Sequence, residues 1–248
     1  SVRDYFTQSS GGAYIPNFDV VGPYTLPNNI SYYGANSGVD DMRPQQMFID
    51  ACQLADDNGL DFTQYDTDND GTVDNVFIIY AGNNEAETSI DSLVWPHSWY
   101  LNDKNTKFDG KSIYLYSCTS ELRGSAKTAA NICGIGTFCH EYSHLLGLPD
   151  LYHTTNSSVF CLDEWDVMDG GLYSNYGKTP TAYSSYERYY LGWLTPEILD
   201  QSTSKTLENL NDSNKAFIVA ASTPNLNGFS PSPKEFFLME NRQKSGFD

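Results

Sequence analysis

The chain has 248 residues, and its 14 Lys and Arg against 32 Asp and Glu give a formal net charge of -18. Such an acidic surface repels the phosphates of nucleic acids and of anionic lipids, so we expect neither as a partner. Hydrophobic residues make up 40% of the chain, which is enough for a folded core. The longest apolar runs are far too short for a transmembrane segment. These features favour a globular protein of one domain, which we expect to be monomeric.

The first half of the chain predicts mixed secondary structure. Residues 1–43 are rich in Gly, Pro, Asn and Tyr with little helical periodicity, which favours strands and turns. Residues 44–58 predict a helix that begins with Pro44 and is followed by Gly59, a residue suited to ending it. Two short runs rich in β-branched and aromatic residues, 73–80 and 112–116, predict buried strands.

The second half continues the alternation. Residues 132–146 predict a second long helix, and Thr179 is expected to be the N-cap of a third helix that continues to Gly192. The runs 216–221 and 235–240 predict a pair of strands joined as a hairpin.

The order of elements favours an α/β fold in two lobes. We expect an upper lobe over residues 1–147, in which a twisted mixed sheet packs on the first two helices. Residues 148–248 would form a lower lobe that is rich in loops. Long loops in a compact domain usually carry functional sites.

One segment has the pattern of a zinc site. His140 and His144 are four residues apart, so on a helix they lie on one face about one turn apart. Two imidazoles in this position can bind one tetrahedral ion, and Glu141 between them can accept a proton from a zinc-bound water. Only four histidines are present, so this arrangement is rarely expected by chance. The alternative is a hydrogen-bonded pair of core histidines.

A third ligand is expected directly after this helix. Gly147 permits a sharp turn, and Asp150 then lies where a carboxylate can reach the ion. The spacing is that of the metzincin peptidases, with Asp in place of their third histidine. His153 is the alternative third ligand.

Two residues further along complete the predicted site. Met168 precedes a Gly-Gly pair, and in metzincins a methionine in such a turn forms the apolar floor under the histidines. Tyr173 follows this turn and can offer a hydroxyl to a tetrahedral intermediate. With 18 tyrosines in the chain, an ordinary structural role for Tyr173 is the alternative.

Taken together, these segments resemble the immune inhibitor A-like zinc metallopeptidases, a secreted bacterial family related to the metzincins. The segments are GIGTFCHEYSHLLGLPDLYH, EWDVMDGG, TPTAYSSYERYYLGWLTP, YDTDNDGTVDNVFIIYAG, VWPHSW, SCTSEL and FFLMENRQ. The resemblance implies a secreted or cell-surface endopeptidase made with a removable prodomain. It also implies that His140, His144 and Asp150 bind zinc and that Glu141 is the general base. Family members usually continue past the last segment, so we expect a chain that is truncated, clipped or completed by another segment.

A second metal site is predicted upstream. Alternating carboxylates, a glycine at the sixth position and an Asp at the ninth match the first nine positions of a calcium loop. The expected calcium ligands are Asp66, Asp68, Asp70, the carbonyl of Thr72, and Asp74. Phe77 occupies the twelfth position, where a complete EF-hand has Glu, and a strand is expected after the loop. An acidic turn without an ion is the alternative.

The function predicted from the sequence is zinc-dependent hydrolysis of peptide bonds in proteins or peptides. The alternatives are a binding or adhesion module that retains the fold without catalysis, and a zinc hydrolase of a non-peptide amide. His97, between two tryptophans, is expected to be a core or cleft-wall residue. The odd number of cysteines leaves at least one free thiol, and their spacing does not determine a pairing.

Overall fold

The computed structural model describes residues 1–103, 105–124, 131–225 and 232–248. The chain divides into two compact units. The first contains Asp19–Leu145, and we call it the zinc-helix unit. The second combines Ser1–Phe18 with Leu146–Asp248, and we call it the Met-turn unit. We expected residues 1–147 to form one lobe, whereas the structure assigns the N-terminal 18 residues to the unit that contains the C-terminus.

The N-terminal segment is helical, so the prediction of only strands and turns over residues 1–43 is wrong. Helix α1 (Val2–Ser9) begins with a capping box, in which Ser1 and Asp4 bond to each other's backbone N–H groups. Its buried face includes Tyr5, whose hydroxyl donates a 2.8 Å hydrogen bond to the carbonyl of Thr181. This contact explains why the segment joins the Met-turn unit. The sequence could not show it, because the partner lies 176 residues away.

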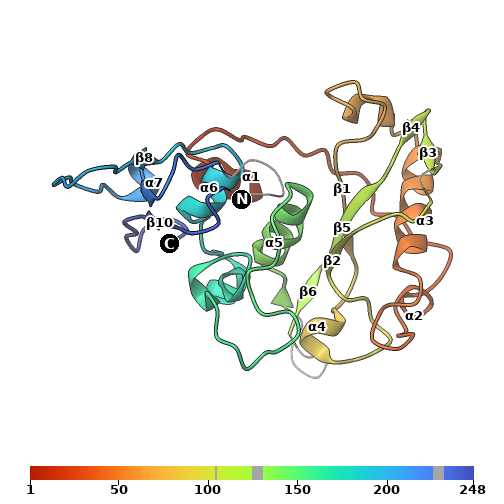
Figure 1. The fold of residues 1–248 in the computed structure, drawn as a ribbon. Coiled ribbons are helices and arrows are strands. Elements are labelled where there is room, and N and C mark those ends of the chain that lie inside the picture. The colour runs from red at the N-terminus through yellow and green to blue at the C-terminus, as the bar shows by residue number, and fades with distance from the viewer. Residues whose placement is uncertain (104, 125–130, 226–231) are drawn as a thin grey trace. The chain divides into compact units, whose positions relative to one another are not determined.

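The zinc-helix unit is built on a three-stranded mixed sheet (Figure 1). Strands β1 (Val76–Tyr80) and β5 (Leu115–Ser120) are parallel, and β2 (His97–Tyr100) pairs antiparallel with β5. The predicted α/β class is confirmed. The strand expected at 112–116 is displaced, because the chain forms the short strand β4 (Lys111–Ser112) first and starts β5 at Leu115.

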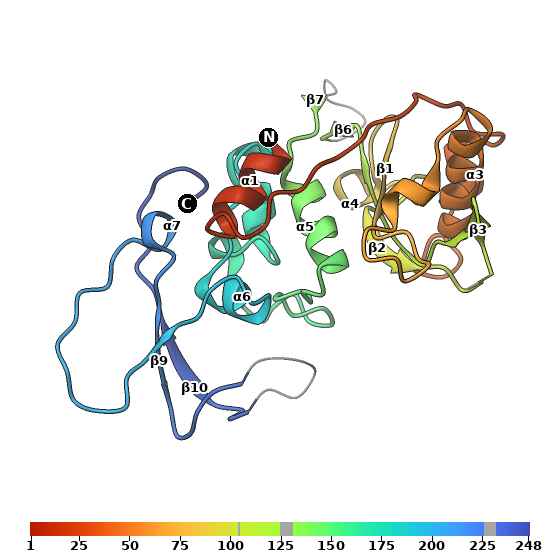
Figure 2. The same cartoon turned by 90° about the horizontal axis from the view of Figure 1, so that it is seen from above.

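Helices cover both faces of this sheet, with α3 (Pro44–Asp57) on one side and α5 (Gly136–Leu145) on the other, as Figures 1 and 2 show. On the α3 side, the Phe48 ring stacks on Tyr116 with 4.6 Å between centroids. On the α5 side, Phe77 and Phe138 stack at 3.9 Å. The two faces of the sheet therefore pack against different helices.

Helix α3 confirms the helix predicted over residues 44–58. Its buried side chains are Met47, Phe48, Cys52 and Ala55, which recur at helical spacing. Gly59 follows with a φ of +89°, a conformation that glycine adopts without steric cost.

The other helix of the zinc-helix unit starts later than expected. The prediction placed residue 132 in it, but Ile132 belongs to the short strand β7 and is 79% exposed. The remaining short elements of the unit are α2 (Ile30–Tyr33), a 3-10 turn (Phe62–Tyr65), α4 (Glu85–Thr88), β3 (Lys107–Phe108), β6 (Leu122–Arg123) and β7 (Asn131–Ile132).

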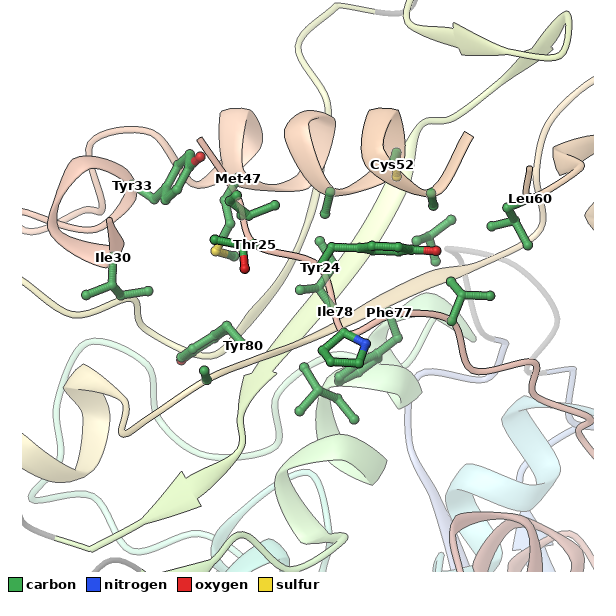
Figure 3. Close-up of a pocket in the computed structure, with 18 of the residues that line it drawn as sticks. Tyr24, Thr25, Ile30, Tyr33, Met47, Cys52, Leu60, Phe77, Ile78 and Tyr80 are labelled. Atoms are coloured by element: carbon green, nitrogen blue, oxygen red, sulfur yellow. The ribbon is translucent and has the colours of Figure 1, made fainter. Parts of the chain in front are cut away.

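A mostly apolar cavity of about 410 Å³ lies between α3 and β1 (Figure 3). Met47 and Cys52 of α3 face Ile78 and Tyr80 of β1 across it, and Tyr24 lies between them. None of the predicted zinc or calcium residues lines this cavity. It is therefore separate from the predicted metal sites.

The Met-turn unit contains a second three-stranded sheet in the order β10-β9-β8. Its β9 and β10 pair antiparallel, which confirms the two strands predicted from residues 216–221 and 235–240. Residues 226–231 of their connection lie outside the described residues. The elements of this unit after α1 are 3-10 helices Asp163–Trp165 and Gly170–Gly177, α6 (Ser185–Tyr190), β8 (Glu197–Ile198), α7 (Leu210–Ser213), β9 (Phe217–Ala220) and β10 (Phe236–Met239).

Helix α6 begins six residues after the expected N-cap at Thr179. Ser184 is the N-cap, and its capping box with Glu187 bonds both N-terminal backbone groups. Residues 179–184 are thus not helical. Over the described residues of both units, no helix is long and apolar enough to cross a membrane.

Candidate metal centre

The two predicted zinc histidines lie together on α5. The rings of His140 and His144 have centroids 4.9 Å apart and are nearly perpendicular. With Glu141 they form one of two groups of side chains in the described residues whose donor atoms all lie within 4.8 Å of one another. His140 and Glu141 are buried and His144 is half-buried. The structure therefore brings together the two histidines and the carboxylate that the helical spacing predicted.

Contacts with the sheet fix the position of α5. Ser117 of β5 is fully buried and donates a 2.9 Å hydrogen bond to the backbone carbonyl of Glu141. Ser143 bonds within the helix to the carbonyl of Cys139 at 2.6 Å. Together with the stacking of Phe138 on β1, these contacts fix the helix that carries the histidines. Sequence reasoning missed Ser117, because a serine in a strand gives no sign of its partner.

The predicted third ligand belongs to the other unit. Gly147 directly follows the helix with a φ of +98°, which is the sharp turn expected there. Asp150 comes three residues later, and the backbone N–H of Leu151 donates to the carbonyl of Met168 at 2.9 Å. Asp150 as a zinc ligand stays a prediction. Its rival His153 is exposed and uses Nδ1 to accept the backbone N–H of Asn156 at 3.1 Å.

The predicted methionine turn is tightly built. Met168 is fully buried, and its backbone N–H donates to the carboxylate of Asp166 at 2.8 Å. The carbonyl of Asp166 accepts the N–H of Gly171 at 2.9 Å, which closes the turn. Tyr173 follows with 52% of its surface exposed, and its catalytic role stays a prediction.

The chain matches a known peptidase family over most of its length. The family described as "Immune inhibitor A peptidase M6, catalytic domain" matches residues 1–194. The chain belongs to this family. The resemblance that the zinc segment suggested is thereby confirmed.

Two curated relatives of this M6 family member cover different shares of the chain. Immune inhibitor A of Bacillus thuringiensis subsp. alesti is 30% identical over 213 residues, which are 76% of this chain and 31% of that protein. Pre-pro-metalloprotease PrtV of Vibrio cholerae serotype O1 (strain M66-2) is 26% identical over 98% of this chain and 30% of its own length. The chain therefore spans about a third of these relatives. The family description names a peptidase catalytic domain, and the relatives are named as an immune inhibitor and a metalloprotease.

The acidic loop of this M6 family member forms the second group of close donor atoms, from Asp66, Asp68 and Asp70. The Asp66 carboxylate accepts the N–H groups of Asp70 and Gly71 at 2.9 and 3.0 Å, and Lys111 forms an ion pair with it at 2.6 Å. The hydrogen bond from Lys111 is the main reason why the pKa of Asp66 is lowered.

The other two predicted calcium residues are Asp74, whose carboxylate is not part of that group, and Thr72, whose backbone N–H donates to Asp70 at 2.7 Å. Asp74 accepts the hydroxyl of Thr67 at 2.5 Å, and Thr72 forms a bridge with Ser112. The loop thus has three clustered carboxylates, and the ammonium group of Lys111 is paired with one of them, that of Asp66. Bound calcium stays a prediction.

His97 is a structural residue in this M6 family member, as expected. Its Nδ1 lies 2.7 Å from the carbonyl of Trp95, and its Nε2 lies 3.0 Å from the hydroxyl of Tyr116. A carbonyl can only accept, so Nδ1 carries the proton and Nε2 accepts from Tyr116. Burial lowers the pKa of His97, which favours this neutral form.

All five cysteines are free thiols. Burial raises the pKa of Cys52 to about 12 and also raises the pKa values of Cys118 and Cys139. These three are therefore unreactive core residues.

Proposed function

We propose that this chain is the catalytic part of a zinc-dependent endopeptidase. The observation that carries the proposal is the cluster of His140, Glu141 and His144 on a buried helix, in a chain of the M6 peptidase family. Two imidazoles and a carboxylate are the donor types that zinc peptidases use. The residues present thus fit a zinc ion, with Asp150 as the third ligand in a metzincin-like arrangement.

The chemistry divides between the metal and the chain. When bound, zinc polarises a carbonyl oxygen and makes a neighbouring water more acidic. Glu141 accepts the proton of the attacking water and then delivers it to the leaving amine. Its helical position next to His140 keeps the carboxylate beside the ligands.

Other residues support this reaction in the proposal. The Tyr173 hydroxyl donates to the oxyanion of the tetrahedral intermediate, and Met168 provides apolar packing under the histidines. The substrates are proteins or peptides. The names of the relatives, an immune inhibitor and a pre-pro-metalloprotease, support a secreted enzyme made as a precursor. Calcium in the loop around Asp66 would be structural.

The test compares the wild type with Glu141→Gln, which preserves size but removes the base. We expect kcat for casein to fall by about 10²–10⁴-fold while zinc content is unchanged. Glu208→Gln, an exposed change of the same charge, is the control and should retain wild-type turnover. Turnover near the wild-type value in Glu141→Gln would refute the assignment.

The same experiment separates the two alternatives. A binding module without catalysis would show no zinc-dependent turnover in the wild type. A hydrolase of non-peptide amides would leave casein intact but cleave amide substrates in a manner that depends on Glu141.

A further inference from the structure

Two buried carboxyl groups meet behind the turn that contains Met168. Asp166 is 1% exposed and Glu187, on α6, is fully buried. The two side chains interact with each other, and each has one buried carboxyl oxygen that no donor group satisfies. Both residues belong to the Met-turn unit.

Two of the four carboxyl oxygens accept backbone hydrogen bonds and two accept none. Asp166 Oδ1 accepts the N–H of Met168 at 2.8 Å, and Glu187 Oε2 accepts the N–H of Ser184 at 2.7 Å. The other two oxygens, Asp166 Oδ2 and Glu187 Oε1, are buried and accept no hydrogen bond from any donor among the described residues. An ionised carboxylate can only accept, so a bond between these two oxygens requires one proton.

We propose that Asp166 and Glu187 share one proton at neutral pH, and that this hydrogen bond positions the Met168 turn and, through it, Asp150. The proton is carried on Glu187 Oε1 and donated to Asp166 Oδ2. The second half of the proposal rests on the proposed function, because it takes Asp150 to be a zinc ligand.

The charges around the pair favour this arrangement. Burial raises the pKa of Asp166 to about 6, while Arg242 partly opposes this and Glu240 adds to it. Burial and then the charge of Asp166 raise the pKa of Glu187 well above its usual range. The nearby guanidinium of Arg188 is directed to the carbonyl of Tyr183 and to the side chains of Asn211 and Asn214. Glu187 therefore keeps the proton.

A short path of backbone bonds leads from the pair to Asp150. Asp166 holds the N–H of Met168, and the carbonyl of Met168 accepts the N–H of Leu151, the residue after Asp150. Loss of the shared proton would place two negative charges in a buried site and push Asp166 away from Glu187. The turn that holds Leu151 would loosen with it. Asp166 and Glu187 are thus positioning residues for Asp150.

The first experiment tests the shared proton in zinc-free protein. Glu187→Gln replaces the protonated acid by an amide of the same shape, which can donate to Asp166 and accept from Ser184. Infrared spectra at neutral pH should show the stretch of a protonated carboxyl in the wild type and in Glu208→Gln, but not in Glu187→Gln. A spectrum without this band in the wild type would overturn the proposal.

Thermal unfolding against pH gives an independent readout. The native pair holds a proton that the unfolded chain releases above about pH 4, so the wild-type melting temperature falls as pH rises from there. The proton on Asp166 contributes to this fall up to about pH 6, whereas the proton on Glu187 contributes from about pH 4 and also above pH 6. Glu187→Gln should therefore lose less stability than the wild type between about pH 6 and pH 9, by at least about 3 °C in melting temperature. Identical slopes in the two proteins would overturn the shared proton.

The second experiment tests positioning through zinc affinity, measured by competition with a chelator at neutral pH. Glu187→Ala should bind zinc about tenfold more weakly, as expected when a supporting residue behind a ligand is lost. Glu187→Gln should stay within about threefold of the wild type, because the amide preserves both hydrogen bonds. Wild-type affinity in Glu187→Ala would overturn the positioning role. If the wild type itself binds no zinc, the proposed function and the positioning role both fail, whereas the infrared band still decides the shared proton.

Discussion

The hydrogen bond between His97 and Tyr116 allows a quantitative test of the sheet that supports the zinc helix. His97→Leu removes the bond to the Tyr116 hydroxyl and the bond to the carbonyl of Trp95. Each neutral hydrogen bond contributes about 1 kcal/mol, and a buried hydroxyl left without an acceptor costs about 1–3 kcal/mol. Tyr116 is fully buried. We therefore expect the free energy of unfolding to fall by about 3–5 kcal/mol.

The assay is a double-mutant cycle in urea on zinc-free protein. Tyr116→Phe removes the other partner of the same bond, so the double variant His97→Leu/Tyr116→Phe should be more stable than the sum of the single losses predicts. The difference should be about 1–2 kcal/mol. Additive losses, within about 0.5 kcal/mol, would refute the hydrogen bond and the tautomer derived from it.

The lowered pKa of His97 also predicts how the stability of the protein changes at acid pH. Because the folded-state pKa of His97 is lowered, its native environment favours the neutral ring. The stabilisation is thus complete above the unfolded value of about 6.5 and is lost as pH falls below it. His97→Leu should lack this loss between about pH 6.5 and pH 5. His153→Leu, which removes an exposed histidine, is the control and should retain it.

Three further outcomes can be measured directly. Ser117→Ala should lower the free energy of unfolding by about 1–2 kcal/mol, since it leaves the Glu141 carbonyl without its 2.9 Å partner; a urea titration with Ser98→Ala as control checks this. Because Lys111 lowers the pKa of Asp66, the wild type should lose stability as pH falls below about 4. Lys111→Met should lack this loss, and an acid unfolding curve identical to that of the wild type would contradict the prediction. Calcium at a hundredfold excess over its Kd should stabilise zinc-loaded protein by about 2.7 kcal/mol, and Asp68→Asn/Asp70→Asn should abolish the shift in melting temperature; a shift that persists would place the ion elsewhere.

Local patterns in the sequence predicted the parts of the site that lie on single elements. The spacing of His140 and His144 was enough to place their rings one helical turn apart, because a helix fixes the relation of residues i and i+4. Helix α3 was found in the same way, from Pro44 at its start and Gly59 after its end. Each of these features depends only on neighbours along the chain.

Two helices start at capping motifs that are visible in the sequence. Ser184 and Glu187 form a capping box, with the spacing that marks a helix start, and this box begins α6 in place of the N-cap expected at Thr179 before Pro180. Likewise, Ser1 and Asp4 cap α1, in a segment whose glycines and prolines suggested strands and turns. In both places a specific cap outweighed the general composition of the segment.

Other features could not be predicted from the sequence at all. Asp166 and Glu187 are 21 positions apart in the sequence. They belong to different motifs, and neither motif predicts a contact between them. Only the fold shows that their carboxyl groups are buried against each other. The bond from Ser117 to Glu141 is of the same kind, since a strand and a helix meet there. Such contacts depend on tertiary packing, which single-sequence patterns do not contain.

The choice between Asp150 and His153 as third ligand is the test on which the zinc assignment finally depends. Asp150 lies between the turn at Gly147, with its φ of +98°, and Leu151, which is bonded to Met168, so its backbone is held on both sides. His153 is exposed and already accepts a hydrogen bond at Nδ1. A catalytic zinc site needs three protein ligands. Asp150→Ala should therefore weaken zinc binding by more than the roughly 10–100-fold expected for a supporting residue, and His153→Ala should leave it near the wild-type value. Competition with a chelator measures both, and circular dichroism checks that each variant folds. If His153→Ala releases zinc and Asp150→Ala retains it, the ligand set is His140, His144 and His153, and the role proposed for Asp166 and Glu187 in holding Asp150 fails with it.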